Sequence, residues 1–303
     1  MNSVHAVVLN HRRCDQVVRC LAALDATEFP GLKVLVVDND SGSAEVHALR
    51  EAGARVVESG GNLGYAGGNN VGIRVALDEG AESVWILNPD IEPRPPALGR
   101  LAAAMAGDPS LGIVGGRLLE DDRSGLRVQS EGGRIVWEAG GRSELIGRGR
   151  IPRRFERRRL RRVDFVPGAA MLIRRAVIEQ IGLLPEEYFM YFEETEYCVR
   201  ATRGGFGVAV EPRAELIHHT PRTVGMPGET FLYYFIRNRL LFGRRHTEFR
   251  FEDLVADVTP FVQGWRRRVI ELDPDWADRF EELIGWAIED ARTGRTGRRD
   301  DVG

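Results

Sequence analysis

The first 115 residues alternate short apolar runs with stretches of helical spacing, and this rhythm constrains the fold more than any other feature. The apolar runs are rich in β-branched residues and occupy residues 6–9, 34–37, 55–57 and 84–87. Nearly continuous apolar strands separated by helical segments are typical of a parallel sheet with helices on both faces. We therefore predict an α/β fold with a Rossmann-like, mainly parallel sheet flanked by helices.

Polar residues follow three of these runs. Asn10 comes after the first, Asp38-Asn39-Asp40 after the second and Asn88-Pro89-Asp90 after the fourth. Ligands of open α/β sheets bind outside the carboxyl ends of the strands, so we expect the active-site rim there. Asp38 can accept a hydrogen bond from a ribose or from the imide N–H of a uracil or thymine base. Ordinary strand-ending turn chemistry is the alternative.

A glycine-rich segment, residues 60–70, opens the helical stretch after the third strand and contains Asn62, Gly64 and Asn69. Glycines let the backbone approach a ligand, and a helix N-terminus favours anions. The glycine spacing and the position after the third strand differ from the dinucleotide fingerprint, which argues against hydride transfer.

Asn88 and Asp90 stand two residues apart, so in an extended segment they project to the same side. They can face one cation and a pyrophosphate together, since magnesium sites commonly use one or two carboxylates plus phosphate oxygens and water. His218-His219, after a short apolar strand, offer an imidazole to complete that site. A proline turn and a solvated histidine pair are the alternatives.

An aromatic run, residues 189–192, precedes three carboxylates, Glu193, Glu194 and Glu196. A helix should begin near Glu193 and stop at the glycine pair 204–205. Within it Glu193 and Glu196 lie three apart on one face, and Glu194 points about 100° away. The aromatics can form a sugar platform beside a catalytic carboxylate. The alternative is that the acids simply complement the helix dipole.

The rest of the chain gives weaker signals. Residues 115–162 break the rhythm, and nine arginines between 146 and 162 predict a loop. That loop can bind an anionic acceptor or an anionic membrane surface, or it is merely solvated. Short strands are expected at 208–210 and 215–217 and an apolar helix at 231–242. Charged helical segments should then run to about residue 292, before a frayed end at 293–303.

Charge and cysteine content exclude several protein classes. The 303 residues include 42 basic and 45 acidic ones, a formal net charge of -3, which argues against a nucleic-acid binder. Three cysteines are too few for a disulfide scaffold or a cysteine-built zinc site. No basic–apolar leader and no apolar run near the roughly 20 residues of a membrane span is present, so we expect a cytoplasmic protein. Peripheral contact with the inner face of the membrane, through residues 146–162, stays open.

The order of the motifs carries more information than any one of them. Val-Leu-Asn, Val-Val-Asp-Asn, Asn-Leu-Gly-Tyr-Ala-Gly-Gly-Asn-Asn, Leu-Asn-Pro-Asp, Val-Pro-Gly-Ala, Tyr-Phe-Met-Tyr-Phe-Glu-Glu and Ile-His-His follow one another along residues 5 to about 245. This series resembles the family 2 glycosyltransferases, and more narrowly their rhamnosyltransferase-type members. The resemblance implies a GT-A fold, a nucleotide-sugar donor, a divalent cation (Mg²⁺ or Mn²⁺) and inversion at the anomeric carbon.

The resemblance also implies roles, position by position. Asp38 matches the nucleobase-binding Asp. Asp90 matches the metal ligand, with His218 or His219 as a late one. Glu194 matches the catalytic base, and Glu193 its neighbour that contacts the acceptor. The other implied donor-binding residues are Asn10, Asn39, Asn62, Gly64, Asn69 and Asn88, and the other implied acceptor-binding residues are Gly168 and Tyr191.

Three positions depart from the family pattern. Asn88 replaces a first Asp, which implies weaker metal binding. The base position holds Glu194 where relatives often carry Asp, so the carboxylate reaches about one methylene further. His11-Arg12 replaces the usual aromatic-Asn pair, which leaves the donor base open.

The resulting prediction is an inverting, metal-dependent glycosyltransferase. Residues 1–245 would form the GT-A domain, with a nucleotide-sugar half at 1–115 and an acceptor half at 163–245, and residues 246–303 a helical extension. The donor would be dTDP-rhamnose or a UDP-sugar. The acceptor would belong to a cell-surface polysaccharide, a glycolipid or a natural product. A non-catalytic nucleotide-sugar-binding subunit and a nucleotidyltransferase are the alternatives, and a homodimer stays open.

Overall fold

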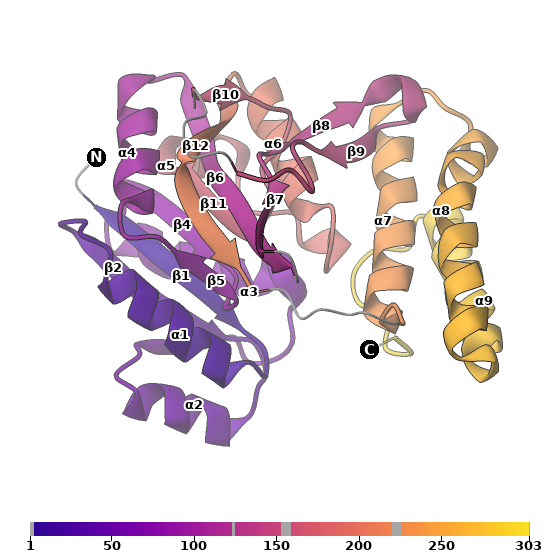
Figure 1. The fold of residues 1–303 in the computed structure, drawn as a ribbon, viewed down its shortest axis with the longest axis horizontal. Helices are drawn as coiled ribbons and strands as arrows, with labels where there is room; N and C mark the ends of the chain where they lie inside the picture. The colour runs from indigo at the N-terminus through magenta and orange to yellow at the C-terminus, as the bar shows by residue number, and fades with distance from the viewer. Residues whose placement is uncertain (1–2, 123–124, 153–158, 220–225, 303) are drawn as a thin grey trace. The chain divides into compact units, whose positions relative to one another are not determined.

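Figure 1 shows the fold in a computed structural model, which describes residues 3–122, 125–152, 159–219 and 226–302. The chain forms two compact units. The first comprises Met1–Arg134, Leu145–Pro185 and Glu194–Thr220, and the second comprises Ile135–Glu144, Glu186–Glu193 and Pro221–Gly303. The domain boundary predicted after residue 245 is a different division of the chain and stays a prediction.

A ten-stranded sheet is the centre of the first unit, in the order β10-β12-β6-β11-β4-β1-β2-β3, with β5 paired to β12 and β7 to β6. Its strands are β1 (Val4–Asn10), β2 (Leu32–Asp38), β3 (Val56–Glu58), β4 (Ser83–Leu87), β5 (Ile91–Pro93), β6 (Leu111–Asp122), β7 (Gly125–Ser130), β10 (Arg161–Arg162), β11 (Ala170–Arg174) and β12 (Gly207–His218). Strands β8 (Gly133–Val136) and β9 (Arg142–Leu145) form a separate two-stranded sheet.

The four strands expected near the N-terminus are all present as β1 to β4, and they run parallel to one another. Strand β11 enters antiparallel between β4 and β6, and β12 pairs parallel with β6. The predicted α/β class, with a sheet flanked by helices, is therefore confirmed.

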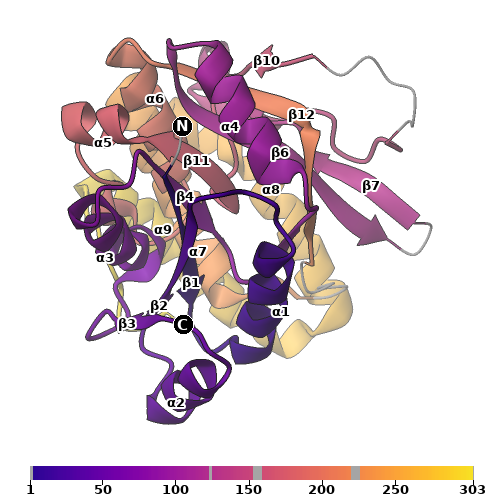
Figure 2. The ribbon, with the colours of Figure 1, turned by 90° about the vertical axis from the view of Figure 1, so that its left-hand side faces the viewer.

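Helices cover both faces of the sheet because alternate strand residues point to opposite sides. Figure 2 shows α3 on one side of strands β1 and β4 and α1 on the other. The helices of this unit are α1 (Cys14–Asp25), α2 (Ser43–Glu51), α3 (Gly64–Asp78), α4 (Ala97–Gly107), α5 (Arg175–Ile181) and α6 (Glu193–Arg203). On the α1 side, Ala6 and Val8 pack with Val17 and Cys20 in a continuous buried cluster. Helix α6 begins and ends where the sequence predicted.

The region 115–162, where the strand–helix rhythm breaks, contains most of β6 and all of β7 to β10. The loop predicted for 146–162 is confirmed for the described residues 146–152 and 159–160, which belong to no helix or strand, and the last two residues form β10. The apolar pattern of β6 is interrupted by Arg117, which is fully buried in an ion pair with the equally buried Glu131. Sequence analysis predicts an arginine to be exposed, because burial of the charge is tolerated only when a partner of opposite charge lies beside it. That partner cannot be identified from the sequence. Of the arginine-rich stretch, residues 153–158 lie outside the described residues.

The two short strands expected at 208–210 and 215–217 are one strand, β12. Its pairing with β6 shifts register between Glu211 and Glu215. Pro212 falls in this irregular part, where a residue without an N–H is tolerated. The proline made one strand look like two.

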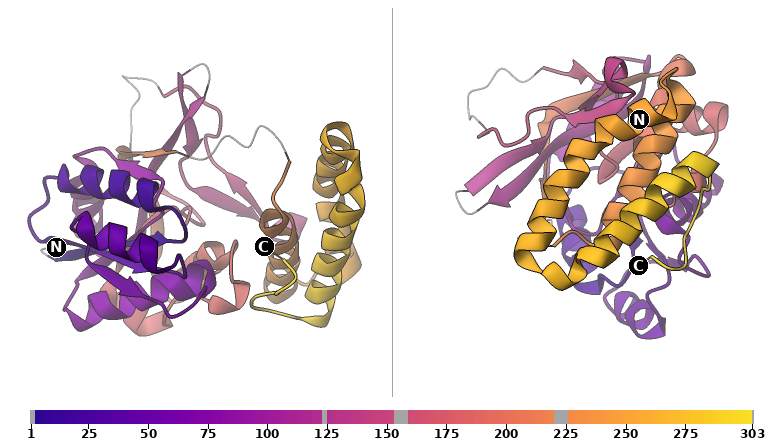
Figure 3. Two further views of the ribbon diagram at one scale, coloured as in Figure 1. Left: turned by 90° about the horizontal axis from the view of Figure 1, so that it is seen from below. Right: turned by 90° about the vertical axis from the view of Figure 1, so that its right-hand side faces the viewer.

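The second unit is built on three helices, α7 (Glu229–His246), α8 (Phe251–Leu272) and α9 (Ala277–Thr293), which Figure 3 shows side by side. Their shared core includes Leu232, Ile236 and Phe280. The frayed end expected at 293–303 is wrong for the described residues to 302, since Val302 is buried in this core and Arg299 pairs with Asp290 at 2.7 Å. Among the described residues, no helix combines the length and apolar character that crossing a membrane requires.

Candidate functional site

The carboxyl ends of β1 and β2 bring Asn10 and Asp38 into direct contact. The two residues are register partners and both are buried. The amide Nδ2 of Asn10 donates to Asp38 Oδ1 at 2.9 Å, and the backbone N–H of Ser41 donates to Asp38 Oδ2 at 3.1 Å. These bonds fix the carboxylate at the sheet edge, where a ligand of this fold class binds.

Asn39 holds the glycine-rich turn. Its Nδ2 donates to Asn62 Oδ1 at 3.2 Å and to the carbonyl of Gly64 at 3.1 Å, and its Oδ1 accepts the backbone N–H of Leu63 at 3.0 Å. Asn62 Oδ1 in turn accepts the N–H of Gly64 at 3.0 Å. Gly64 has a φ of 72°, a left-handed conformation that favours glycine. The structure thus gives Asn39 the bonding of a loop-fastening side chain, and donor binding by these residues stays a prediction.

The glycines of α3 bring the helix against the sheet. A Cβ at Gly72 would lie 2.4 Å from Val7 Cγ1, and one at Gly68 would lie 2.5 Å from Leu9 Cδ1. These two glycines therefore serve helix–sheet packing. The side-chain amide of Asn69, on the same helix, donates to the carbonyl of Tyr65 at 2.9 Å. Its buried Oδ1 accepts no hydrogen bond from the residues that the structure describes.

The segment after β4 brings Asp90 to His218. Strand β5 pairs antiparallel with the end of β12, so that Ile91 is the register partner of His218. Asp90 Oδ1 then lies 3.2 Å from His218 Nε2. On the other side of the ring, His218 Nδ1 lies 2.7 Å from Gln129 Oε1, which can only accept. In this amide orientation Gln129 favours the tautomer with the proton on Nδ1, in which the Nε2 lone pair faces Asp90. Nothing in the sequence marked Gln129, because it reaches this point on the distant strand β7.

The two histidines of the predicted pair have different partners. The backbone N–H of His219 donates to the carbonyl of Asp90 at 2.8 Å, but its side chain turns to Glu92, with Nε2 2.8 Å from Oε2. His218 is the histidine whose ring faces Asp90. Asn88 stands at the start of this turn, where its carbonyl accepts the N–H of Ile91 at 3.2 Å.

The Asp90–His218 pair suits a hard divalent cation. The Asp90 carboxylate oxygen and His218 Nε2, 3.2 Å apart, attract each other when a proton or a cation lies between them. A carboxylate oxygen and a neutral imidazole nitrogen are both suitable ligands, and a diphosphate and water can fill the other positions. The described residues contain no group of three or more His, Cys, Asp or Glu side chains arranged for a metal. Such a site would thus depend on ligands from a bound diphosphate.

Gly168 lies between Tyr65 and Glu194. A Cβ at Gly168 would meet Tyr65 Oη at 3.1 Å and Glu194 Cβ at 3.4 Å, and the Tyr65 hydroxyl donates to the Gly168 carbonyl. The bare backbone at Gly168 therefore keeps space beside Glu194. Tyr65 belongs to the glycine-rich motif, and its hydroxyl group joins α3 to Gly168.

The three carboxylates at the start of α6 differ in exposure. Glu193 and Glu196 are 4% and 3% exposed, whereas Glu194 is partly exposed. Glu194 Oε1 lies 3.2 Å from the hydroxyl of Thr195. Tyr191 and Glu193, the other expected acceptor residues, belong to the second unit.

The buried cysteines near these carboxylates are thiols and not nucleophiles. Burial, together with the charge of Asp90, raises the pKa of Cys20 to about 12. Burial, with a smaller contribution from Glu194, raises the pKa of Cys198 to about 12. At neutral pH both stay protonated, so covalent catalysis through them is not supported.

The comparisons with known proteins concern the family and the fold. A family model described as glycosyl transferase family 2 matches residues 5–182. The low-salt glycan biosynthesis hexosyltransferase Agl10 of Haloferax volcanii is 34% identical over 212 residues, which cover 68% of this chain and 66% of that protein. The chain thus spans just under two thirds of the length of that relative. The N-acetylglucosaminyl-diphospho-decaprenol L-rhamnosyltransferase of Mycobacterium tuberculosis is 30% identical over 226 residues, covering 68% of this chain and 73% of that protein.

The mannosyltransferase PcManGT from Pyrobaculum calidifontis, solved in complex with GDP-Man and Mn²⁺, has a similar fold. The TM-score is 0.57 at 13% identity, over 96% of this chain and 87% of that one. This likeness concerns the fold alone, and it confirms the predicted GT-A architecture.

Proposed function

Because the chain belongs to glycosyl transferase family 2, we propose that it is an inverting glycosyltransferase, which moves a sugar from a nucleotide-sugar donor to an acceptor hydroxyl group. The observation that carries this proposal is the pairing of Asp90 with His218, 3.2 Å apart, directly after β4. Strand β4 is the neighbour of β1, whose end bears Asn10 bonded to Asp38. A base-binding carboxylate and a diphosphate-binding pair thus belong to neighbouring strand ends.

The donor would bind along this edge. Asp38, held by Asn10, would accept a hydrogen bond from the nucleobase or ribose. The turn fastened by Asn39 would present its backbone to the ribose and diphosphate. The full set of proposed donor-binding residues is Asn10, Asp38, Asn39, Asn62, Gly64, Asn69, Asn88 and Asp90.

Mg²⁺ or Mn²⁺ would be held by Asp90 and His218, with His219 as the weaker candidate because its ring is engaged by Glu92. When bound, the cation neutralises charge that develops on the leaving diphosphate. Gln129 supports this assignment, since a histidine that binds a metal commonly donates its other N–H to a neighbouring acceptor.

Glu194 would act as the base. The acceptor oxygen attacks the anomeric carbon on the face opposite the diphosphate, the bond from that carbon to the phosphate oxygen breaks, and Glu194 takes the acceptor proton. General-base catalysis contributes about 10²- to 10⁴-fold in rate. Glu193, Tyr191 and Gly168 would contact the acceptor. The single displacement requires no covalent intermediate.

Rhamnose is the first donor sugar to test, because the rhamnosyltransferase-type resemblance agrees with the name of the Mycobacterium tuberculosis relative. The proposed process is assembly of a surface polysaccharide, a glycolipid or a glycosylated natural product. The test is transfer by the purified chain with Mn²⁺ from dTDP-rhamnose, UDP-glucose, UDP-galactose and GDP-mannose to N-acetylglucosaminyl-diphospho-decaprenol. Release of nucleoside diphosphate with a glycosylated lipid supports the proposal. Formation of a nucleoside triphosphate and a sugar 1-phosphate from the donor when pyrophosphate is added would identify a nucleotidyltransferase instead, and donor binding without turnover of any kind would identify a non-catalytic subunit.

A cytoplasmic location, contact of residues 146–162 with the membrane, and a homodimer are further proposals. Co-sedimentation with anionic vesicles and light scattering test the last two. Loss of vesicle binding after the arginines at 148, 150, 159, 161 and 162 become Gln would support membrane contact.

A further inference from the structure

The backbone directly before α6 is strained. Phe189, Tyr191 and Phe192 have φ values of 65°, 66° and 75°, a left-handed conformation that bulky residues rarely adopt. Phe189 and Phe192 are also buried. Strained residues of this kind persist only where the surrounding structure holds them in place, and they concentrate at functional sites. Residues 188–192 are called the loop below, and side chains of α7 hold it.

Asn238 of α7 contacts three backbone carbonyls of the loop. It is fully buried, and its amide nitrogen lies 2.9 Å from the carbonyl oxygen of Tyr188, 2.6 Å from that of Met190 and 2.9 Å from that of Tyr191. Three backbone carbonyls of one short loop therefore converge on a single –NH₂ group. An asparagine supplies two uncharged N–H donors on one short side chain.

Arg237 fixes the orientation of that amide. Its Nε–H donates to Asn238 Oδ1 at 2.9 Å, so the –NH₂ group must point toward the loop. Its Nη2 donates to the Tyr188 carbonyl at 2.9 Å, and its guanidinium lies 4.8 Å from the ring centroid of Tyr234. Both Arg237 and Asn238 are inaccessible to solvent, which makes their hydrogen bonds costly to lose.

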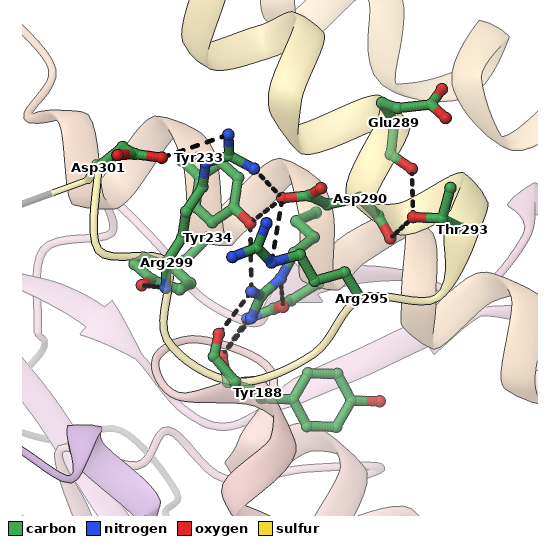
Figure 4. Close-up of polar contacts among 12 residues, drawn as sticks. Tyr188, Tyr233, Tyr234, Glu289, Asp290, Thr293, Arg295, Arg299 and Asp301 are labelled. Carbon is green, nitrogen blue, oxygen red and sulfur yellow. Dashed lines mark hydrogen bonds and ion pairs between the residues drawn. The ribbon is translucent and has the colours of Figure 1, made fainter.

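The segment after α9 closes the same arrangement. Arg237 Nη1 donates to the carbonyl of Gly297 at 2.6 Å, and the N–H of Gly297 donates to the carbonyl of Glu187 at 2.6 Å. Figure 4 shows how this segment is anchored, with the Arg299 guanidinium against Asp290, at 2.7 Å. Residues predicted to be frayed are thus hydrogen-bonded both to α7 and to the residue that precedes the loop.

We propose that Arg237 and Asn238 are positioning residues of the transfer reaction. They hold the loop in the strained conformation that sets the start of α6, and Glu193 and Glu194 are the first two residues of that helix. The inference rests on the proposed function, because it assigns Glu194 as the base. Neither residue touches the reacting atoms; they act through the backbone of the loop.

The experiment compares Asn238→Ala, Asn238→Asp and Arg237→Lys with Arg239→Lys. Arg239 is the matched control: it is the next residue of α7, it is buried, and it braces other carbonyls, those of Ala139 and Gly140. Three quantities are measured on the full chain: kcat for transfer with the donor and acceptor found active in the wild type, Kd for dTDP with Mn²⁺, and hydrogen–deuterium exchange of peptides covering 186–193 and 135–144.

We expect Asn238→Ala and Asn238→Asp to lower kcat by at least tenfold while Kd for dTDP stays within threefold. Arg237→Lys keeps the charge but loses the Nε–H donor to Asn238, so it should lower kcat by a smaller factor. This variant tests the inference if the Asn238 variants do not fold. Exchange should rise at 186–193 in these variants and at 135–144 in Arg239→Lys, which should keep its kcat within threefold.

Unchanged kcat in all folded variants would overturn the inference, as would an equal loss of kcat in Arg239→Lys or unchanged exchange at 186–193. A wild-type chain that transfers no sugar would contradict the proposed function and remove the catalytic half of this inference. The exchange data would then decide by themselves whether the pair holds the loop.

Discussion

Gly72→Ala should separate the packing role of the α3 glycines from helix propensity. The new Cβ would lie 2.4 Å from Val7 Cγ1 and 2.8 Å from Val37 Cγ2, whereas ordinary contact begins near 3.4 Å. Helix α3 would therefore have to retreat from β1 by about 1 Å. Overpacking of this kind costs about 1–3 kcal/mol, against a gain of up to about 1 kcal/mol from replacing a helical glycine with alanine.

Gly99→Ala is the matched control in the same unit, because a Cβ on that α4 residue meets nothing within 4 Å. It should raise the free energy of unfolding by up to about 1 kcal/mol. The free energy of unfolding of Gly72→Ala should be about 1–3 kcal/mol lower than that of Gly99→Ala, measured by urea denaturation followed by circular dichroism. Affinity for dTDP should also fall, since α3 carries Asn69. If Gly72→Ala is as stable as Gly99→Ala, the close-packing account of these glycines is wrong.

Three further predictions follow from the site. Gln129→Leu removes the acceptor of the His218 Nδ1 proton, so calorimetry should show Mn²⁺-dependent affinity for dTDP falling about 10- to 100-fold, with metal-free affinity unchanged; an unchanged Mn²⁺ dependence would contradict the tautomer assignment. Asp90→Ala should abolish Mn²⁺-dependent binding and transfer, and retention of either would remove Asp90 as a ligand. Because burial raises the pKa of Cys20 and Cys198 to about 12 from 9.0, their contribution to stability is present below about pH 9 and is lost as pH rises toward 12. The double variant Cys20→Ala/Cys198→Ala should therefore lose stability less steeply than the wild type as pH rises from about 9 to about 11, measured by thermal denaturation. The same dependence of stability on pH in both proteins would refute this prediction.

The sequence predicted the half of the fold in which local pattern and burial agree. Strands β1 to β4 are nearly continuous apolar runs, and the start of α6 is marked by acids and its end by glycines. It failed where burial depends on a distant partner. Arg117 interrupts an apolar strand and is tolerated there because Glu131 and Glu215 pair with it. The segment around Gly297 looks frayed in the sequence, but α7 supplies a hydrogen-bond partner for it.

The same limit applies to the site. Asn10, Asp38 and Asp90 could be grouped because strand ends of one sheet meet at one edge. Gln129 and Asn238 could not, since each acts from an element far away in the chain on the side chain or loop that it helps to orient. Neither residue type by itself indicates its partner, because glutamine and asparagine can hydrogen-bond to any nearby donor or acceptor.

Assignment of Glu194 as the base is tested most directly by steady-state transfer and donor Kd for Glu194→Gln beside Glu193→Gln and Glu196→Gln. Glutamine keeps the shape of the side chain and removes the proton acceptor. Turnover by Glu194→Gln should therefore fall by about 10²-fold or more with donor Kd unchanged, while Glu196→Gln, a buried side chain, should affect stability more than rate. Retention by Glu194→Gln of more than about a tenth of wild-type turnover, an effect under about 1.4 kcal/mol, would contradict the mechanism.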